Sequence, residues 1–232
     1  LTGIHLGHYK PALLPLLQEL EKVEGLDRIR LSSIESIEVS DELLDWVAAS
    51  GKACAHLHLP LQSGSDAILS AMRRPYNSVD FAAVVARIRS RMPFAGITTD
   101  LIVGFPGETD ELFVETLRFL EEMQFSRIHI FKFSPRDGTP AATMGGQIDN
   151  ATKNRRSDEV EAVWQNSAQS FYQRFIGREL EILWETSEAG IIHGFSREYI
   201  PCLMVADDKL LNQITNVRGL SVTPQGLQVA GI

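Results

Sequence analysis

The sequence predicts an α/β fold, an open parallel sheet with helices between its strands, followed by a small all-β barrel. In residues 1–176, short runs of apolar, β-branched residues alternate with segments whose apolar residues recur at helical spacing. This alternation is typical of a parallel sheet built from crossovers. After residue 176 the helical spacing stops, and short alternating runs are separated by glycine and polar turns. We therefore expect two domains, residues 1–176 and residues 177–232.

Five strands are expected in the first domain. LTGIHL has the pattern of the end of a strand, and RIRLSSI (28–34) has that of the next. AHLHLPLQ (55–62), ITTDLIVGF (97–105) and RIHIFKFS (127–134) follow. Five strands are too few for the eight of a closed β/α barrel, so an open or partial barrel fits better.

Helices are expected between these strands, and capping residues mark where several of them begin. Ser40 precedes DELLDWVAAS, and Asn77 or Ser78 precedes VDFAAVVARIRSRM. Thr109 precedes ELFVETLRFLEEM, whose first turn is acidic, as a helix dipole favours. A long helix is expected from about residue 155 to residue 176, where a glycine ends it.

The second domain is predicted from five short segments that lack any helical stripe. They are ELEILWETS, GIIHGFS, YIPCLMVA, NQITNVRGLSVTP and GLQVAGI. Each alternates apolar and polar residues, and polar or glycine turns separate them, which indicates a compact β-barrel.

Composition excludes several classes of protein. The net charge of −8 argues against a generally basic nucleic-acid binder, although it leaves room for a local basic patch. No apolar run approaches the roughly 20 residues of a membrane span. Cys54 and Cys202 lie far apart and match neither a disulfide framework nor metal-ligand spacing. The chain opens with Leu1 in the middle of a pattern, so we expect a fragment of a longer cytoplasmic protein.

Polar and glycine residues follow each expected strand. They include Gly3 and His5, Ser33 and Glu35, Gln62 and Ser63, the GFPGET loop (104–109), and Ser134. Because the carboxyl ends of parallel strands meet at one edge of a sheet, these turns are expected to face one cleft. The cleft would hold a polar small molecule. Ordinary turn chemistry explains any one of these turns alone.

Other candidate sites remain open. His56 and His58 lie on one face of a strand, but no third metal ligand accompanies them. Single carboxylates such as Glu35, Asp100 and Glu108 could do acid–base work. The arginines of VARIRSRM form either a solvated helix face or an RNA contact. We find no Walker loop, dinucleotide fingerprint or Ser-His-Asp order.

Several motifs, taken in order, resemble the radical S-adenosylmethionine (SAM) methylthiotransferases. The motifs are LTGIHLGHY, RLSSIE, HLPLQSGSDAILSAMRRPY, TTDLIVGFPGET and FKFSPRDGTPAA. LTGIHLG, LSSIE and GFSREYI most resemble the branch that acts on N6-threonylcarbamoyladenosine in tRNA. The branches acting on isopentenyladenosine and on a small-subunit ribosomal protein usually differ there. The tail from Gly177 resembles the family's TRAM domain, a small RNA-binding β-barrel.

The resemblance implies a partial parallel β/α barrel of the radical SAM type and an enzyme that adds a methylthio group to C2 of adenosine 37, next to the anticodon. It implies SAM and two [4Fe–4S] clusters, each held by three cysteines, as cofactors. Its implied partners are the tRNA anticodon loop, an electron donor and a sulfur source, with no membrane.

By position, the resemblance also implies site residues. Those for SAM are Gly3, His5, Ser33, Glu35, Gln62, Ser63, Asp100, Gly104, Phe105, Pro106, Gly107, Glu108, Phe131, Phe133 and Ser134. Those for RNA are Arg197, Tyr199 and Arg218.

The sequence departs from the family at the cysteines, because neither triplet is present. Catalytic residues are therefore not assigned, and the chain itself is expected to be inactive and to hold no metal. The alternatives are a relative acting on isopentenyladenosine tRNA or a ribosomal protein, or a non-catalytic RNA-binding relative. A partial-barrel enzyme for a phosphate-bearing substrate is disfavoured by the acidic helix start after GFPGET.

Overall fold

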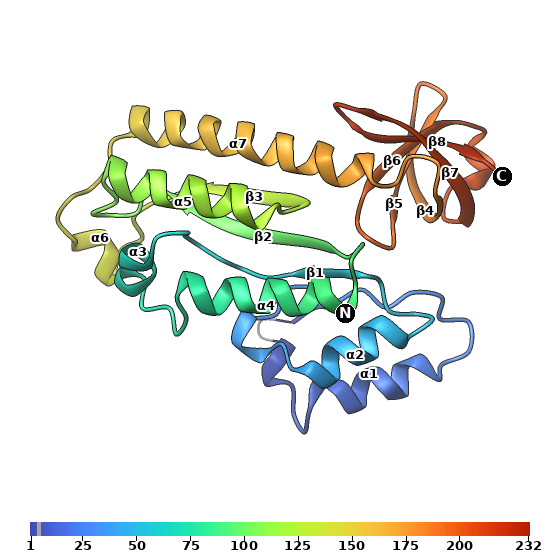
Figure 1. The fold of residues 1–232 in the computed structure, drawn as a ribbon, viewed down its shortest axis with the longest axis horizontal. Helices are drawn as coiled ribbons and strands as arrows, with labels where there is room; N and C mark the ends of the chain where they lie inside the picture. The colour runs from blue at the N-terminus through green and yellow to red at the C-terminus, as the bar shows by residue number, and fades with distance from the viewer. Residues whose placement is uncertain (4–5) are drawn as a thin grey trace.

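A computed structural model describes residues 1–3 and 6–232, so His5 lies outside the described residues. An α/β unit and a β-barrel are connected by the long helix α7 (Asn150–Gln173), which runs along the sheet to the barrel (Figure 1). None of the helices in the described part of the chain is long and apolar enough to span a membrane.

The sheet of the α/β unit contains three parallel strands in the order β1-β2-β3. They are β1 (His56–His58), β2 (Gly96–Val103) and β3 (Arg127–Lys132). β1 and β2 align His56 with Gly96, and β2 and β3 align Thr98 with Arg127. The last three predicted strands are therefore confirmed, although β1 and β3 are shorter than expected.

Neither of the first two predicted segments forms a strand in its described residues. In the first, residues 1–3 are not in a strand and Leu6 begins a 3-10 helix, η1 (Leu6–His8), while residues 4 and 5 lie outside the described part. Residues 28–34 form two isolated parallel bridges, Ile29 with Ala53 and Ser33 with His58 of β1. The Leu1 amino group donates to the Arg30 carbonyl, and the Leu1 carbonyl accepts from the Ser32 N–H. The start of the chain therefore lies beside residues 28–34. Backbone neighbours are thus in the expected order, but the ladder is too interrupted to form strands.

Helices connect and cover these strands. They are α1 (Leu13–Glu21), the 3-10 helix η2 (Ser36–Glu38), α2 (Asp41–Ala49), α3 (Asp66–Ala71), α4 (Ser78–Arg91), α5 (Asp110–Met123) and α6 (Pro140–Thr143). The predicted caps are confirmed, because Ser40, Asn77 and Thr109 each accept a backbone N–H of the first turn. α7 begins earlier than expected, since Asp149 caps it by accepting from Thr152.

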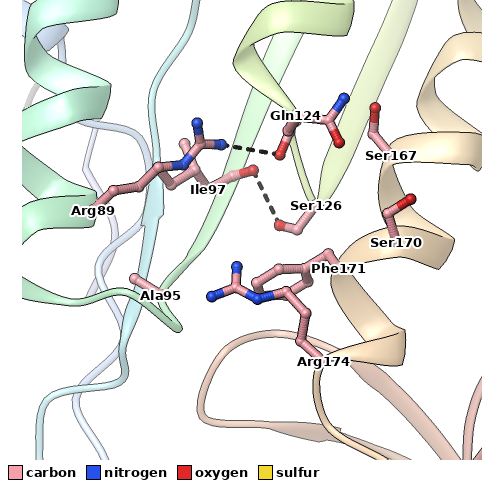
Figure 2. Close-up of a pocket in the computed structure, with 9 residues that line it drawn as sticks. All are labelled: Arg89, Ala95, Ile97, Gln124, Ser126, Ser167, Ser170, Phe171 and Arg174. Carbon is pink, nitrogen blue, oxygen red and sulfur yellow. Dashed lines mark hydrogen bonds between the residues drawn. The ribbon is translucent and has the colours of Figure 1, made fainter.

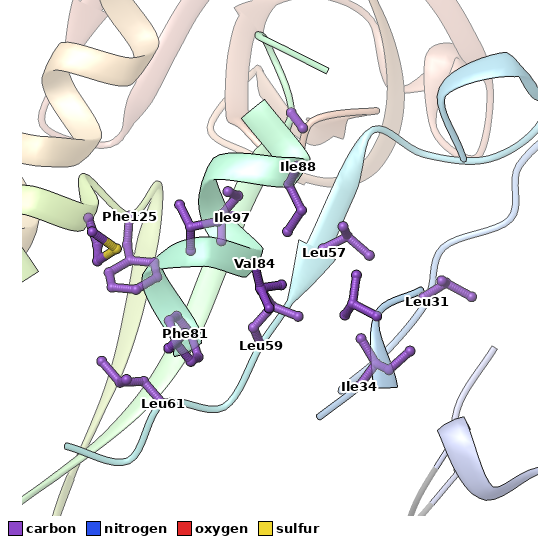
Figure 3. Close-up of a cluster of buried hydrophobic side chains, with 14 of the residues drawn as sticks. Leu31, Ile34, Leu57, Leu59, Leu61, Phe81, Val84, Ile88, Ile97 and Phe125 are labelled. Carbon is purple, nitrogen blue, oxygen red and sulfur yellow. The ribbon is translucent and has the colours of Figure 1, made fainter. Parts of the chain in front are cut away.

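A single apolar cluster lies between the sheet and these helices. Leu57 and Ile97 point from the strands toward Phe81 and Val84 of α4, with Phe125 beside them (Figure 3). Since successive strand residues point to opposite faces, this packing leaves the alternate residues of β1, β2 and β3 on the other face.

The remaining chain folds into a closed barrel of five strands in the order β4-β5-β6-β8-β7. The strands are β4 (Glu179–Glu188), β5 (Ile191–Ser196), β6 (Pro201–Val205), β7 (Ile214–Thr223) and β8 (Gly226–Gly231), with a 3-10 helix, η3 (Asp208–Leu210), before β7. Trp184 is fully buried in the barrel and donates to Thr215 Oγ1 at 2.8 Å. Phe171 and Phe175, from the end of α7 and the turn after it, pack into the same core.

Arginines from the α/β unit hold the barrel in place. Arg28 donates to Glu181 Oε1 at 2.9 Å, and Arg30 donates to the Ser196 carbonyl at 2.8 Å. Arg197 of the barrel donates in return to the Ala53 carbonyl at 2.7 Å. The barrel therefore lies against the start of β1, a placement that no sequence pattern indicated.

Candidate functional site

The face of the sheet opposite the helices carries polar and aromatic side chains. Thr98, Asp100 and Ile102 alternate along this face of β2, with Thr98 buried and Asp100 and Ile102 half-buried. His129 and Phe131 occupy the same face of β3, at register positions beside Asp100 and Ile102. Two cavities adjoin on this face, and both are lined by Asp100 and Phe131.

The first cavity, here called the strand-end cavity, has a volume of about 410 Å³. Its lining includes Gln62, Asp100, Ile102, Phe131, Phe133 and Ser134. Phe131 is 53% exposed, so its ring is available for stacking. Gln62 has a positive φ of 69° and bridges Leu101 through its backbone, which places it beside β2. Aromatic rings next to carboxylate and amide groups fit a nucleoside, whose base stacks and whose ribose forms hydrogen bonds.

The second cavity, here called the inner cavity, has a volume of about 540 Å³ and lies between the sheet and the barrel. Its lining includes Arg30, Ser32, Ser33, His56, His58, Thr98, Asp100, His129, Phe131 and the barrel residue Tyr199. Tyr199 stacks on Phe195 at 4.7 Å between ring centroids and lies equally close to the His56 ring.

A chain of hydrogen bonds crosses the floor of the inner cavity. His58 Nε2 lies 3.2 Å from Asp100 Oδ2, and His58 Nδ1 lies 2.9 Å from the Thr98 hydroxyl. His56 Nε2 contacts the same hydroxyl at 2.9 Å. Burial, and then the charge of Arg30, hold the pKa of His56 well below its ordinary value, so this imidazole is neutral.

The GFPGET loop is held by internal contacts. Glu108 is buried, accepts the Gly104 N–H at 2.7 Å and pairs with Arg156 at 2.8 Å. Burial raises the pKa of Glu108 against the opposing effect of these two partners. The Glu108 side chain is thus committed to the loop itself, contrary to the expectation that it faces the cleft.

Other loop residues support the strand-end cavity indirectly. Phe105 is buried with its ring 5.3 Å from Phe133, which lines the cavity. Pro106 is buried, and Gly107 donates to the Gly146 carbonyl at 2.9 Å. Gly104 lies against Lys153 of α7.

Three further predicted SAM residues also lie away from the strand-end cavity. Ser63 is fully buried and its hydroxyl faces Thr116 of α5 at 3.3 Å, because residues 63–65 turn under that helix. Glu35 pairs with Arg74 at 3.3 Å. Gly3 is exposed, with Leu6 as its near neighbour.

Of the predicted RNA-binding residues, the structure brings only Tyr199 into a cavity. The Arg197 guanidinium is used in the contact with Ala53, and Arg218 pairs with Glu179 at 3.0 Å. Sequence analysis missed Arg30, Thr98 and His129. Thr98 and His129 each lie two residues from a predicted site residue, so strand alternation could have found them.

A smaller cavity of about 280 Å³ lies at the other end of the sheet, beside Ala95 and Ile97 (Figure 2). Its guanidinium groups already donate to carbonyls, Arg89 to Gln124 and Arg174 to Pro93. The other arginines of α4, Arg87 and Arg91, pair with Asp41 and Asp45 of α2 at the surface.

The described residues fit one of the expected cofactors, SAM, but not the iron–sulfur clusters. The strand-end cavity suits SAM through Phe131, Phe133, Gln62 and Asp100. The described residues contain no group of three or more His, Cys, Asp or Glu that could hold a metal ion. The two cysteines of the sequence, both buried, do not fit a three-cysteine cluster site.

Comparison with known proteins decides the family. Residues 2–120 match the sequence profile of the Radical SAM superfamily. The chain belongs to this superfamily. A solved structure with a similar fold is coproporphyrinogen III oxidase (HemN) from Escherichia coli, a radical SAM enzyme. The TM-score is 0.52 at 21% identity, over 67% of this chain and 36% of HemN.

The predicted resemblance to methylthiotransferases is confirmed by curated relatives of this radical SAM chain. It is 38% identical over 229 residues to threonylcarbamoyladenosine tRNA methylthiotransferase MtaB of Bacillus subtilis, covering 94% of this chain and 51% of that protein. The Thermotoga maritima MtaB is 39% identical over 98% of this chain and 53% of its own length. The tRNA-2-methylthio-N(6)-dimethylallyladenosine synthase of Kineococcus radiotolerans is 43% identical over 78% of this chain and 35% of its own length. The chain spans about half the length of the MtaB relatives.

Proposed function

We propose that this chain is the SAM-binding and RNA-facing part of a radical SAM tRNA methylthiotransferase. The reaction proposed is the addition of a methylthio group to C2 of N6-threonylcarbamoyladenosine at position 37, next to the anticodon. The observation that carries the proposal is the pair of adjoining cavities that share Asp100 and Phe131 on one sheet face. One cavity suits a cofactor and the other suits a substrate beside it. The names of the MtaB relatives supply the acceptor.

In this proposal the strand-end cavity binds SAM. Phe131 and Phe133 flank the adenine ring, while Gln62 and Asp100 form hydrogen bonds with the ribose. Bound SAM would supply the radical that begins the reaction. The GFPGET loop positions these residues, because Phe105 packs against Phe133 and the Glu108–Arg156 pair fixes the loop to α7. The two iron–sulfur clusters would be held by the proposed cytoplasmic parent protein, and an electron donor and a sulfur source would be its partners.

Residues 177–232 are proposed to act as a TRAM-like barrel that contacts the tRNA anticodon loop, with residues 1–176 as the radical SAM unit. The stacked Phe195 and Tyr199 rings support this role, since single-stranded RNA is recognised largely by stacking. Arg197 and Arg218 would be able to contact phosphates only if their present partners release them.

Binding of SAM to this chain tests the first part of the proposal. We expect equilibrium dialysis with radiolabelled SAM to show binding, and Phe131→Ala to weaken it about tenfold, since stacking on one ring contributes about 1–3 kcal/mol. Val79→Ala, which removes a side chain 72% exposed on α4, is the matched control and should leave the affinity unchanged. Equal affinities of the Phe131 variant and the unmodified chain would contradict the proposed site.

The reaction is tested on the full-length product of the gene. Its clusters would be reconstituted without oxygen and supplied with SAM, a reductant, sulfide, and tRNA carrying either adenosine modification. A methylthio gain only on threonylcarbamoyladenosine, seen by nucleoside mass spectrometry, is the expected result. A gain only on isopentenyladenosine would retain the chemistry and overturn the acceptor. With clusters verified, no gain on either would favour a non-catalytic RNA-binding protein or a different acceptor.

A further inference from the structure

The walls of the inner cavity contain buried polar atoms that lack a partner among the described residues. They are the Ser32 hydroxyl and His56 Nδ1. A buried polar group left unpaired costs about 1–3 kcal/mol, so such groups are usually satisfied by a ligand or an ordered water. Two of them in one cavity indicate that its occupant forms hydrogen bonds.

Arg30 supplies a positive charge to the same cavity. Its guanidinium donates to the carbonyls of Ser196 and Arg197, and it lies 4.8 Å from the centre of the Tyr199 ring. These bonds use two of the five N–H groups of an arginine. In the described residues Arg30 forms no ion pair with a carboxylate, although neighbouring Arg28 pairs with Glu181. Burial lowers the pKa of Arg30, although Cys54, Tyr199 and Glu198 oppose this effect.

Two of the acidic groups near the cavity already have partners, whereas Glu198 lies near enough to Arg30 to raise its pKa. Asp100 accepts from His58, and Glu181 pairs with Arg28 and lies 3.6 Å from Arg197. The other ionisable side chains in the lining are those of His56, His58, His129 and Tyr199. Asp100 lines both cavities, whereas Arg30 lines the inner one alone. The part of the inner cavity at Arg30 is therefore complementary to an anion that also forms hydrogen bonds, and it is poorly suited to an apolar group.

We propose that the inner cavity binds the amino-acid substituent of the acceptor nucleoside, with Arg30 binding its carboxylate. This inference rests on the proposed function and deepens it. A threonylcarbamoyl group has a carboxylate, a hydroxyl and N–H groups, whereas a dimethylallyl group has none of them. A dimethylallyl group would leave Arg30 without a carboxylate and the Ser32 hydroxyl and His56 Nδ1 without a partner. Sites built for hydrogen bonds reject analogues that lack them by large factors. The inner cavity thus determines which modified adenosine is accepted.

His56 and Tyr199 are positioning residues in this proposal. In the His58 tautomer whose Nε2–H donates to Asp100, Nδ1 accepts from the Thr98 hydroxyl, which in turn accepts from His56 Nε2–H. That order leaves His56 Nδ1 as a hydrogen-bond acceptor. The ring of Tyr199 contacts both His56 and Arg30, so the barrel fixes the two groups relative to each other.

The experiment measures binding of free nucleosides to this 232-residue chain by isothermal titration calorimetry. The probes are N6-threonylcarbamoyladenosine, its methyl ester and isopentenyladenosine. We expect the acid to bind at least tenfold more tightly than the ester, which keeps the shape but loses the charge. Arg30→Gln should remove this preference, and Arg30→Lys should retain part of it.

Arg28→Gln is the matched control, because Arg28 also donates to the barrel but lies outside the cavity lining and has its own carboxylate partner. Thermal melting followed by circular dichroism would show whether either glutamine variant has lost the fold. Equal affinities for acid and ester would overturn the proposal, as would loss of the preference in Arg28→Gln to the same extent. No measurable binding of the acid would overturn it too.

These outcomes are distinct from failure of the proposed function. A full-length protein that methylthiolates threonylcarbamoyladenosine tRNA, while the chain binds acid and ester equally, retains the function and places the substituent elsewhere. A full-length protein that modifies only isopentenyladenosine tRNA would overturn the proposed acceptor whatever the cavity binds.

Discussion

Glu108 and Arg156 form an ion pair with 2.8 Å between Oε2 and Nη1, and their side chains are only 1% and 3% exposed. Glu108 lies in the GFPGET loop and Arg156 in α7, so the pair joins the loop after β2 to the helix that leads to the barrel. Removing one partner of such a pair leaves a buried charge uncompensated, which costs far more than breaking an exposed pair.

We therefore expect Arg156→Leu to lower the free energy of unfolding by about 3–5 kcal/mol. Urea denaturation followed by tryptophan fluorescence would measure it. Arg155→Leu is the control, since Arg155 shares the partner Asp110 but is 50% exposed, so this variant should lose much less stability. Similar losses in both variants would show that the buried pair has no special role.

Gly104→Ala should lower the free energy of unfolding more than Gly107→Ala does. Both glycines have positive φ, 74° and 84°, so each substitution has the left-handed penalty of about 1–2 kcal/mol. Only at Gly104 would the added methyl meet a neighbour, at 2.4 Å from Lys153 Cγ. Because the Lys153 ammonium lies over the Phe133 ring, SAM affinity should also fall in that variant alone. Equal stability of the two variants would contradict this account.

His56 should make the fold sensitive to mild acid. Its pKa is lowered in the folded state by burial, so below the unfolded value of about 6.5 the unfolded chain takes up a proton that the folded chain refuses. Stability contributed by His56 is thus present above that pH and is lost as the pH falls. Between pH 7.5 and pH 5.5 we expect the unmodified chain to lose about 1 kcal/mol more than His56→Gln. Parallel urea titrations would check this, and identical pH profiles would count against it.

Gly96 is a contact point between the sheet and the barrel. A methyl group added there would lie 2.0 Å from the carbonyl oxygen of Glu198, a backbone atom that cannot rotate away. We expect Gly96→Ala to displace the barrel, with a loss of about 1–3 kcal/mol and faster proteolysis near residues 173–179. Gly145→Ala, with no neighbour within 4 Å, is the control. Unchanged proteolysis at Gly96→Ala would indicate that the barrel contact is easily remade.

Much of the fold could be predicted because the decisive signals are local. Thr109 caps α5 through its own side chain, and the alternating runs after Gly177 give five barrel strands regardless of what they pack against. Residues 28–34 resembled a strand equally well. Their arginines bond to the barrel instead, and only isolated bridges remain.

In the candidate site, too, some features could be predicted from the sequence and others could not. Gln62, Asp100, Phe131, Phe133 and Ser134 were predicted and line one cavity, because residues at adjacent strand ends must lie together in a parallel sheet. Position along the chain could not show that Glu108 turns inward to a buried arginine, or that Ser63 faces α5. Those orientations depend on partners that lie 48 and 53 residues away.

The sequence by itself determined the family, the α/β-then-β order of elements, the helix caps and the residues at the strand ends. Tertiary structure alone decided that Tyr199 of the barrel closes a cavity with Arg30 and His56 of the α/β unit. The physical reason is the distance along the chain over which each signal acts. Periodicity and capping act within a few residues, whereas the charge, burial and hydrogen bonding of a cavity depend on side chains brought together by the packing of two units.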